Sequence, residues 1–149
     1  MMVPGGIQEA TLTCAGKERL FLHSRKGFIK YSLQYGYSLT PVYAFGETDA
    51  FNNVQGGMDW RLKLNRGIFG MMQGLPTVAP YGWRCFPLVP EPNVKITIVV
   101  GPPLQLPHIA SPTKEDVELW HQAYEHAVKE LYDAGVQQTG APARELNIC

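Results

Sequence analysis

The chain has 149 residues and a formal net charge of zero, because thirteen basic residues balance thirteen acidic ones. This balance argues against nucleic acid as a partner, since proteins that neutralise phosphates usually carry a basic excess. Hydrophobic residues make up 45% and charged residues 17%, which is typical of a globular domain rather than a disordered chain. The three cysteines are far apart and odd in number, so neither a disulfide framework nor a metal site is indicated.

The N-terminus leads directly into a tight turn at Gly5 and Gly6. Two interpretations are open: a short surface arm, or a chain that begins in the middle of a fold. No signal peptide is indicated, because no charged segment precedes an apolar stretch. The longest aliphatic run, residues 96–100, is about a quarter of the length that a membrane span needs.

A strand, a helix and a second strand are predicted in succession. Residues 19–23 are predicted to form a short strand, and the apolar spacing over residues 26–35 predicts a helix. Ser24 is the expected N-cap and Gly36 the expected stop. Residues 39–45 follow as an apolar strand. This order is typical of a βαβ unit in a buried parallel sheet, so the fold class is predicted to be α/β.

The rest of the chain is predicted to hold a strand and an amphipathic C-terminal helix. Residues 60–72 favour a helix, either in the core or at a membrane interface, and these two interpretations remain open. Residues 94–100 predict a strong strand. The last helix is expected to begin at an N-cap, Ser111, and to end at Gly135, with residues 136–149 as a mobile tail.

Three short segments carry residues suited to binding or acid–base chemistry. A glycine pair followed by a carboxylate lets main-chain N–H groups approach a ligand, although such a turn with a solvated glutamate is more common. Cations at a helix start form an anion site, with a solvated basic face as the alternative. The third segment ends a strand with a glycine and a carboxylate. The candidate binding residues are Gly5, Gly6, Glu9, Arg25, Lys26, Gly27, Phe28, Lys30, Pro41, Phe45, Gly46 and Glu47.

In this order and spacing the three segments resemble the type-2 diacylglycerol acyltransferase family, which includes monoacylglycerol and wax-ester acyltransferases. The motifs are Gly5-Gly6-x-x-Glu9, Arg25-x-Gly27-Phe28-x-Lys30 and Pro41-Val42-x-x-Phe45-Gly46-Glu47. Residues 97–103 and the last helix resemble the family as well, so the resemblance covers roughly residues 3–134. It implies that residues 1–135 are the C-terminal part of a glycerophospholipid-acyltransferase-like domain.

The resemblance also implies a reaction and a place in the cell. The reaction is transfer of a fatty acyl group from acyl-CoA, as substrate and without a cofactor, to the hydroxyl of diacylglycerol or a related lipid alcohol, as in triacylglycerol synthesis. The place is the cytosolic face of the endoplasmic reticulum membrane, or a lipid droplet. By position, Glu9 would orient the acceptor or a histidine, and Arg25, Lys26 and Lys30 would suit the CoA phosphates.

The family's catalytic His-Pro-His-Gly tetrapeptide does not occur in this sequence, and none of its four histidines matches a family catalytic position. We therefore expect a truncated chain with no catalytic residue of its own, inactive alone and prone to associate with membranes or with itself through an exposed apolar surface. One alternative is a non-catalytic fragment that binds lipid, acyl-CoA or a partner. Another is a small soluble protein in which the motifs serve only structure. Glu118 and His121, at di-iron spacing, are expected on an exposed helical face rather than at a metal.

Overall fold

The computed structural model describes residues 2–6, 9–10, 13–53, 80–83, 86 and 88–149. The chain divides into two compact units. The first comprises residues 1–21, 46–96 and 144–147, and the second comprises residues 22–45, 97–143 and 148–149. Helices and small sheets are mixed along the chain, as the α/β prediction requires. The helix predicted over residues 60–72, with its membrane-interface alternative, lies outside the described residues.

Helix α2 (Gly27–Tyr35) confirms the predicted helix in the second unit, with a different start. Its N-cap is Lys26 and not Ser24, and no side chain caps the helix. Gly36 ends the helix as predicted, because it takes the left-handed conformation at φ 66° and its N–H returns to the carbonyl of Leu33. Ile29 and Leu33, one turn apart, form the fully buried face.

Helix α5 (Lys114–Thr139) begins two residues later than predicted and extends beyond its predicted end. Its N-cap is Thr113 rather than Ser111, and Thr113 and Asp116 form a reciprocal capping box. The helix ends at Gly140. Gly135, the predicted stop, is instead a buried residue inside the helix.

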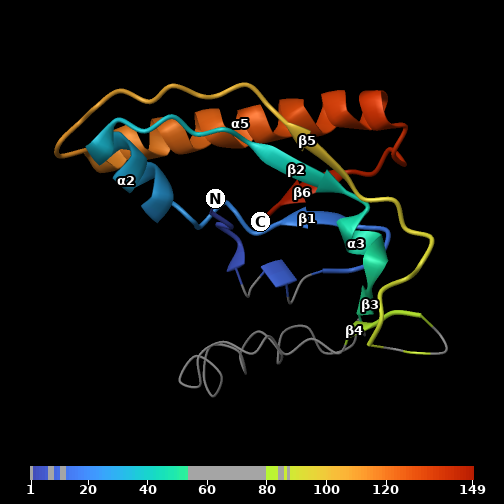
Figure 1. The fold of residues 1–149 in the computed structure, drawn as a ribbon. Coiled ribbons are helices and arrows are strands. Elements are labelled where there is room, and N and C mark those ends of the chain that lie inside the picture. The colour runs from blue at the N-terminus through green and yellow to red at the C-terminus, as the bar shows by residue number, and fades with distance from the viewer. Residues whose placement is uncertain (1, 7–8, 11–12, 54–79, 84–85, 87) are drawn as a thin grey trace, which may run out of the picture. The chain divides into compact units, whose positions relative to one another are not determined.

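Strands β2 (Val42–Phe45) and β5 (Thr97–Val100) pair antiparallel in the second unit (Figure 1). An isolated bridge between Leu39 and Leu104 continues the pairing. The predicted βαβ unit is therefore wrong. The strand before α2, β1 (Glu18–Leu20), pairs with β6 (Leu146–Ile148) and not with β2. The last turn of α5 and strand β6 both lie within residues 136–149, which we expected to be a mobile tail.

The core of the second unit is built where α2, α5 and the β2–β5 pair meet. Ile29 and Leu33 of α2 pack with Leu106, and the aromatic residues Trp120 and Tyr124 of α5 lie against this cluster. Further along, α5 lies beside one face of the β2–β5 pair (Figure 1). Burial of this apolar surface is the main stabilising term for the unit.

The first unit contains short elements. Besides β1, they include α3 (Glu47–Ala50) and the antiparallel pair of β3 (Asn52–Asn53) with β4 (Pro80–Tyr81). The main-chain N–H of Glu91 donates to the carbonyl of Ala50 at 2.9 Å, which joins the segment after β4 to the end of α3. Among the described residues, no helix combines the length and the apolar character needed to cross a membrane.

Candidate functional site

Glu9 lies directly against the glycine turn of the first unit. Its Oε2 accepts a hydrogen bond from the main-chain N–H of Phe21 at 2.9 Å. A β-carbon on Gly5 would overlap the carboxyl group and the β-carbon of Glu9. Only glycine at position 5 therefore lets the Glu9 side chain fold back against its own turn. Glu9 is thus not the solvated glutamate of an ordinary turn.

Burial raises the pKa of Glu9 above its usual 4.5, the hydrogen bond from Phe21 lowers it, and the nearby charge of Glu47 raises it further. Glu47 is exposed and begins α3. The two acidic residues named by the sequence motifs thus lie close enough in the first unit to affect each other electrostatically. A carboxyl group that is partly buried and has a raised pKa is suited to proton transfer or to orienting a hydroxyl.

The main-chain conformation between β2 and Glu47 requires a glycine at position 46. It has φ 86°, a left-handed conformation that other residues rarely adopt. A β-carbon at this position would collide with the carbonyl oxygen of Lys95. This close approach accounts for the Phe45-Gly46-Glu47 motif as a turn that fixes where Glu47 begins α3.

A buried polar network in the first unit was missed by sequence reasoning. Arg144 donates to Glu18 at 3.1 Å and to Asp49 at 2.8 Å, and the hydroxyl of Thr48 also donates to Glu18 at 3.1 Å. Glu18 is only 5% exposed, so these donors hold a carboxylate that is shielded from water. The pKa of Arg144 is raised, chiefly by its hydrogen bond to Asp49. Nothing in local sequence spacing links residues this far apart along the chain.

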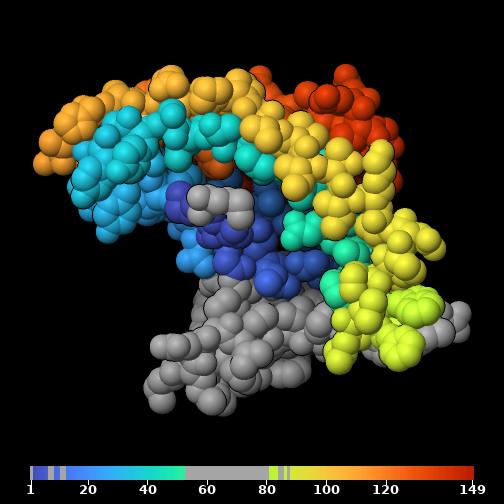
Figure 2. Space-filling view, in the orientation of Figure 1, coloured from blue at the N-terminus to red at the C-terminus, as the bar shows by residue number. Residues whose placement is uncertain are grey.

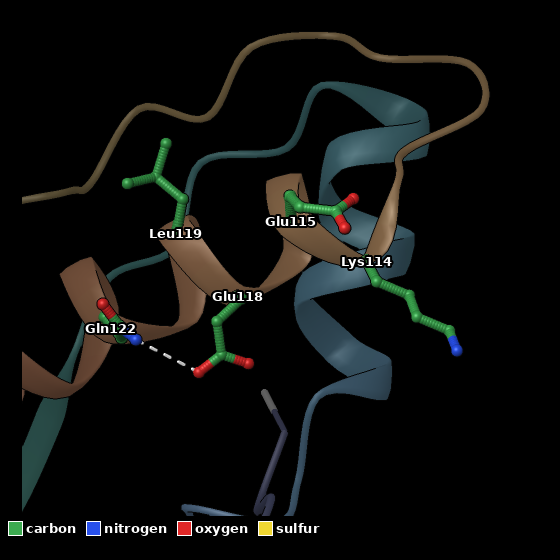
Figure 3. A pocket seen from close by; sticks show the side chains of 5 residues that line it. All are labelled: Lys114, Glu115, Glu118, Leu119 and Gln122. Carbon is green, nitrogen blue, oxygen red and sulfur yellow. Dashed lines mark hydrogen bonds between the residues drawn. The ribbon is translucent and has the colours of Figure 1, made fainter.

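The basic cluster of the second unit lies at the start of α2, and one of its members is already paired. The ammonium of Lys26 forms an ion pair with the carboxylate of Glu118 on α5. Lys30 is exposed one turn further on, while Arg25 is partly buried. Figure 3 shows that Glu118 also accepts a hydrogen bond from Gln122, at 3.1 Å. The pKa of Glu118 is lowered, first by the hydrogen bond from Lys26 and next by that from Gln122.

Most of the other candidate residues of the second unit make packing contacts. Pro41 is fully buried, and Phe45 lies within the core, stacked on Tyr132 at a centroid distance of 5.4 Å. Phe28 packs edge-on against Tyr124 of α5 at 5.2 Å. Gly27 is exposed with open space around it. These contacts give Pro41, Phe45 and Phe28 a packing role.

His121 corrects the expectation of an exposed helical face, because its side chain is only 1% exposed. Its Nε2 lies 3.1 Å from the carbonyl of Leu22, and a carbonyl can only accept, so Nε2 carries a proton. Its Nδ1 faces Oε1 of Glu125 at 3.5 Å, and Nδ1 of His23 approaches the same oxygen at 3.3 Å. The buried histidine thus ties the segment before α2 to α5.

A surface hollow at the start of α5 is lined by charged and polar side chains and one leucine, on successive turns. Glu118 and Leu119 project to different sides of the helix in Figure 3. The lining residues are Lys114, Glu115, Glu118, Leu119 and Gln122. Two carboxylates and one ammonium do not favour an anion here. Within the part of the chain that the structure describes, no group of three or more His, Cys, Asp or Glu side chains is placed to hold a metal ion.

Comparison with known proteins decides the family. The family model described as diacylglycerol acyltransferase matches residues 1–148. The chain belongs to the diacylglycerol acyltransferase family. This match confirms the family resemblance that the three glycine-containing motifs indicated. The match extends over nearly the whole chain.

Several curated members of the family are similar to this chain over most of its length. Diacylglycerol O-acyltransferase 2 of Xenopus tropicalis is 37% identical over 95% of the chain and 40% of the relative. The human protein of the same name is 30% identical over 98% of the chain and 39% of the relative. Human diacylglycerol O-acyltransferase 2-like protein 6 is 36% identical over 99% of the chain and 46% of the relative. No solved structure matches.

The chain therefore spans about two fifths of the length of these acyltransferase relatives. The match places Glu9, with its glycine turn, and the basic start of α2 inside a diacylglycerol acyltransferase sequence. The glycerophospholipid-acyltransferase-like form of the fold, in contrast, remains a prediction.

Proposed function

We propose that this chain is part of an O-acyltransferase that moves a fatty acyl group from acyl-CoA to the hydroxyl of diacylglycerol or a related lipid alcohol. The observation that carries the proposal is the family match over residues 1–148. In this proposal acyl-CoA is a substrate, and no separate cofactor takes part. The site of action is the cytosolic face of the endoplasmic reticulum membrane or the surface of a lipid droplet.

In the proposed reaction a general base removes the proton of the acceptor hydroxyl, which then attacks the thioester carbonyl. The sequence contains no His-Pro-His-Gly tetrapeptide, the catalytic motif of the family that it resembles, so we propose that in a complete enzyme this base is supplied from outside these 149 residues. Glu9 is proposed to orient the acceptor hydroxyl or that base. A carboxylate has several acceptor sites, so Glu9 can hold the N–H of Phe21 and a second donor at the same time.

The CoA phosphates are proposed to bind at the start of α2, where free main-chain N–H groups favour an anion. Glu118 already neutralises the ammonium of Lys26, whereas Lys30 is exposed on the next turn of α2, so the geometry favours Lys30 over Lys26. In a complete enzyme that carries these residues, Arg25→Ala and Lys30→Ala should raise the KM for acyl-CoA more than the KM for the glyceride. Lys26→Ala should have a smaller effect and provides the matched control.

Two assays test the proposed function. The isolated chain, incubated with labelled oleoyl-CoA and diacylglycerol, should give no product above a heat-killed control, since loss of a general base costs a factor of about 10²–10⁴. A chimera tests the same residues in a complete enzyme: this chain replaces the matched stretch of the Xenopus tropicalis relative. The chimera should form triacylglycerol. A well-expressed chimera that transfers acyl groups to no glyceride or alcohol would refute the proposal.

Because the sequence lacks the His-Pro-His-Gly tetrapeptide, a second function is considered: a non-catalytic fragment that binds acyl-CoA, lipid or a partner. The chimera separates the two. If the chain is adapted only for binding, the chimera will be inactive. The isolated chain will nevertheless retain acyl-CoA in equilibrium dialysis.

A further inference from the structure

The β2–β5 pair has two faces of opposite environment. On one face Phe45 and Val99 lie against α5, and a β-carbon on Gly135 of α5 would touch both side chains. The antiparallel register places Val42 opposite Val100, and Ala44 opposite Ile98. Because side chains alternate along a strand, these four residues share the other face.

This second face, which we call the aliphatic sheet face (Val42, Ala44, Ile98 and Val100), is open to water. Val42 is 56% exposed, Ile98 65% and Val100 63%. In the space-filling view the surface of β5 runs beside that of β2 (Figure 2). Together the side chains expose on the order of 300 Å² of apolar surface, the size of the largest patch on a typical monomer.

The strand edges add a second requirement. Among the described residues the sheet has only two strands, so each of β2 and β5 has an outer edge with no neighbouring strand. Such edges present main-chain N–H and C=O groups to a partner. Lipid tails could cover the aliphatic side chains but cannot satisfy these polar groups. A polypeptide can do both.

The size of the patch narrows the choice of polypeptide. A stable complex between separate molecules buries about 800 Å² on each partner, well above the area that this face offers. A second copy, packed face to face, would fall far short of that area. A polypeptide that also contacts other parts of the chain does not need to bury about 800 Å² on this face alone. The curated relatives contain such polypeptide, because more than half of their length lies outside the matched stretch.

We propose that the aliphatic sheet face docks the portion of a diacylglycerol acyltransferase that lies outside the stretch matched by this chain. The inference rests on family membership and not on acyl transfer, so it is tested by binding alone.

The test is co-expression of the tagged chain with the portion of the Xenopus tropicalis relative outside the matched stretch, followed by capture in mild detergent. The wild-type chain should retain this portion. Ile98→Asp, which places a charge in the centre of the face, should reduce the captured amount at least tenfold. Leu119→Asp is the matched control, because Leu119 is also an exposed aliphatic residue of the second unit, 63% exposed but on α5; it should leave capture unchanged.

Circular dichroism checks that both variants keep their helices, as expected for substitutions at exposed positions. Equal capture by the wild type and by Ile98→Asp would overturn the proposal, and so would no capture by the wild type. Two further outcomes would assign the face to another occupant. One is a wild-type dimer in sedimentation that Ile98→Asp dissociates. The other is flotation with phosphatidylcholine–diacylglycerol vesicles that Ile98→Asp abolishes. Either result without capture of the relative's segment overturns the proposal.

Discussion

Gly135→Ala is expected to destabilise the second unit, although alanine is the better helix former. Gly135 lies inside α5, and a methyl group there would lie 2.5 Å and 2.6 Å from two ring carbons of Phe45. The ring cannot easily withdraw, because Phe45 is only 4% exposed and its centroid lies 4.9 Å from Tyr43 and 5.4 Å from Tyr132.

Two opposing terms set the magnitude. Removing a glycine from a helix interior stabilises by about 1 kcal/mol. Forcing an extra carbon into a packed core costs about 1–3 kcal/mol. The rigid surroundings of Phe45 favour the middle of that range, so the net loss of stability is about 1 kcal/mol. For a chain of this size such a loss lowers Tm by about 2–8 °C.

Thermal unfolding followed by circular dichroism at 222 nm measures the effect. Ala134→Gly is the control, because Ala134 is exposed at the neighbouring position of α5 and loses only helix propensity. A double-mutant cycle with Phe45→Leu isolates the contact, since leucine lacks the ring edge. A higher Tm for Gly135→Ala, or additive effects in the cycle, would show that Phe45 does not exclude a side chain at position 135.

Three further changes test other contacts. Burial raises the pKa of Glu9, so the stability that the protonated Glu9 contributes is complete below its ordinary pKa of 4.5 and is lost as pH rises through the raised value. The Tm of Glu9→Gln should therefore rise relative to that of the wild type between about pH 4 and pH 7. A Tm difference that stays constant with pH would contradict the raised pKa. Arg144→Met should cost about 2 kcal/mol in urea unfolding by removing a donor from buried Glu18, and no loss would mean that the network is dispensable. Thr113→Ala should cost about 1 kcal/mol in the same assay, with Ser111→Ala, predicted to be neutral, as its comparison.

The sequence predicted those elements whose signals are local. The apolar spacing of α2 and the glycine at position 36 are enough to place a helix and its end, because both act within a few residues. The start of α5 also carries a local signal in the sequence. Thr113 and Asp116 have capping-box spacing, whereas Ser111-Pro112 only resembles a start.

The wrong predictions concern interactions between distant residues. A strand, a helix and a strand in succession do not determine which strands pair, and β2 pairs with β5 more than fifty residues later. Gly135 weakens a helix by only about 1 kcal/mol, which packing against Phe45 can outweigh. The burial of His121 also depends on a distant residue, because its partner is the carbonyl of Leu22, so its spacing within the helix did not predict an interior position.

The contact between Gly5 and Glu9 has a consequence for how this sequence can vary. A β-carbon at position 5 would occupy the space that the Glu9 side chain fills, so position 5 is restricted to glycine as long as Glu9 is kept. In a pairwise mutational scan the two sites should show strong epistasis. Gly5→Ala should be harmful alone and much better tolerated beside Glu9→Gly, which makes the pair a single unit of sequence variation.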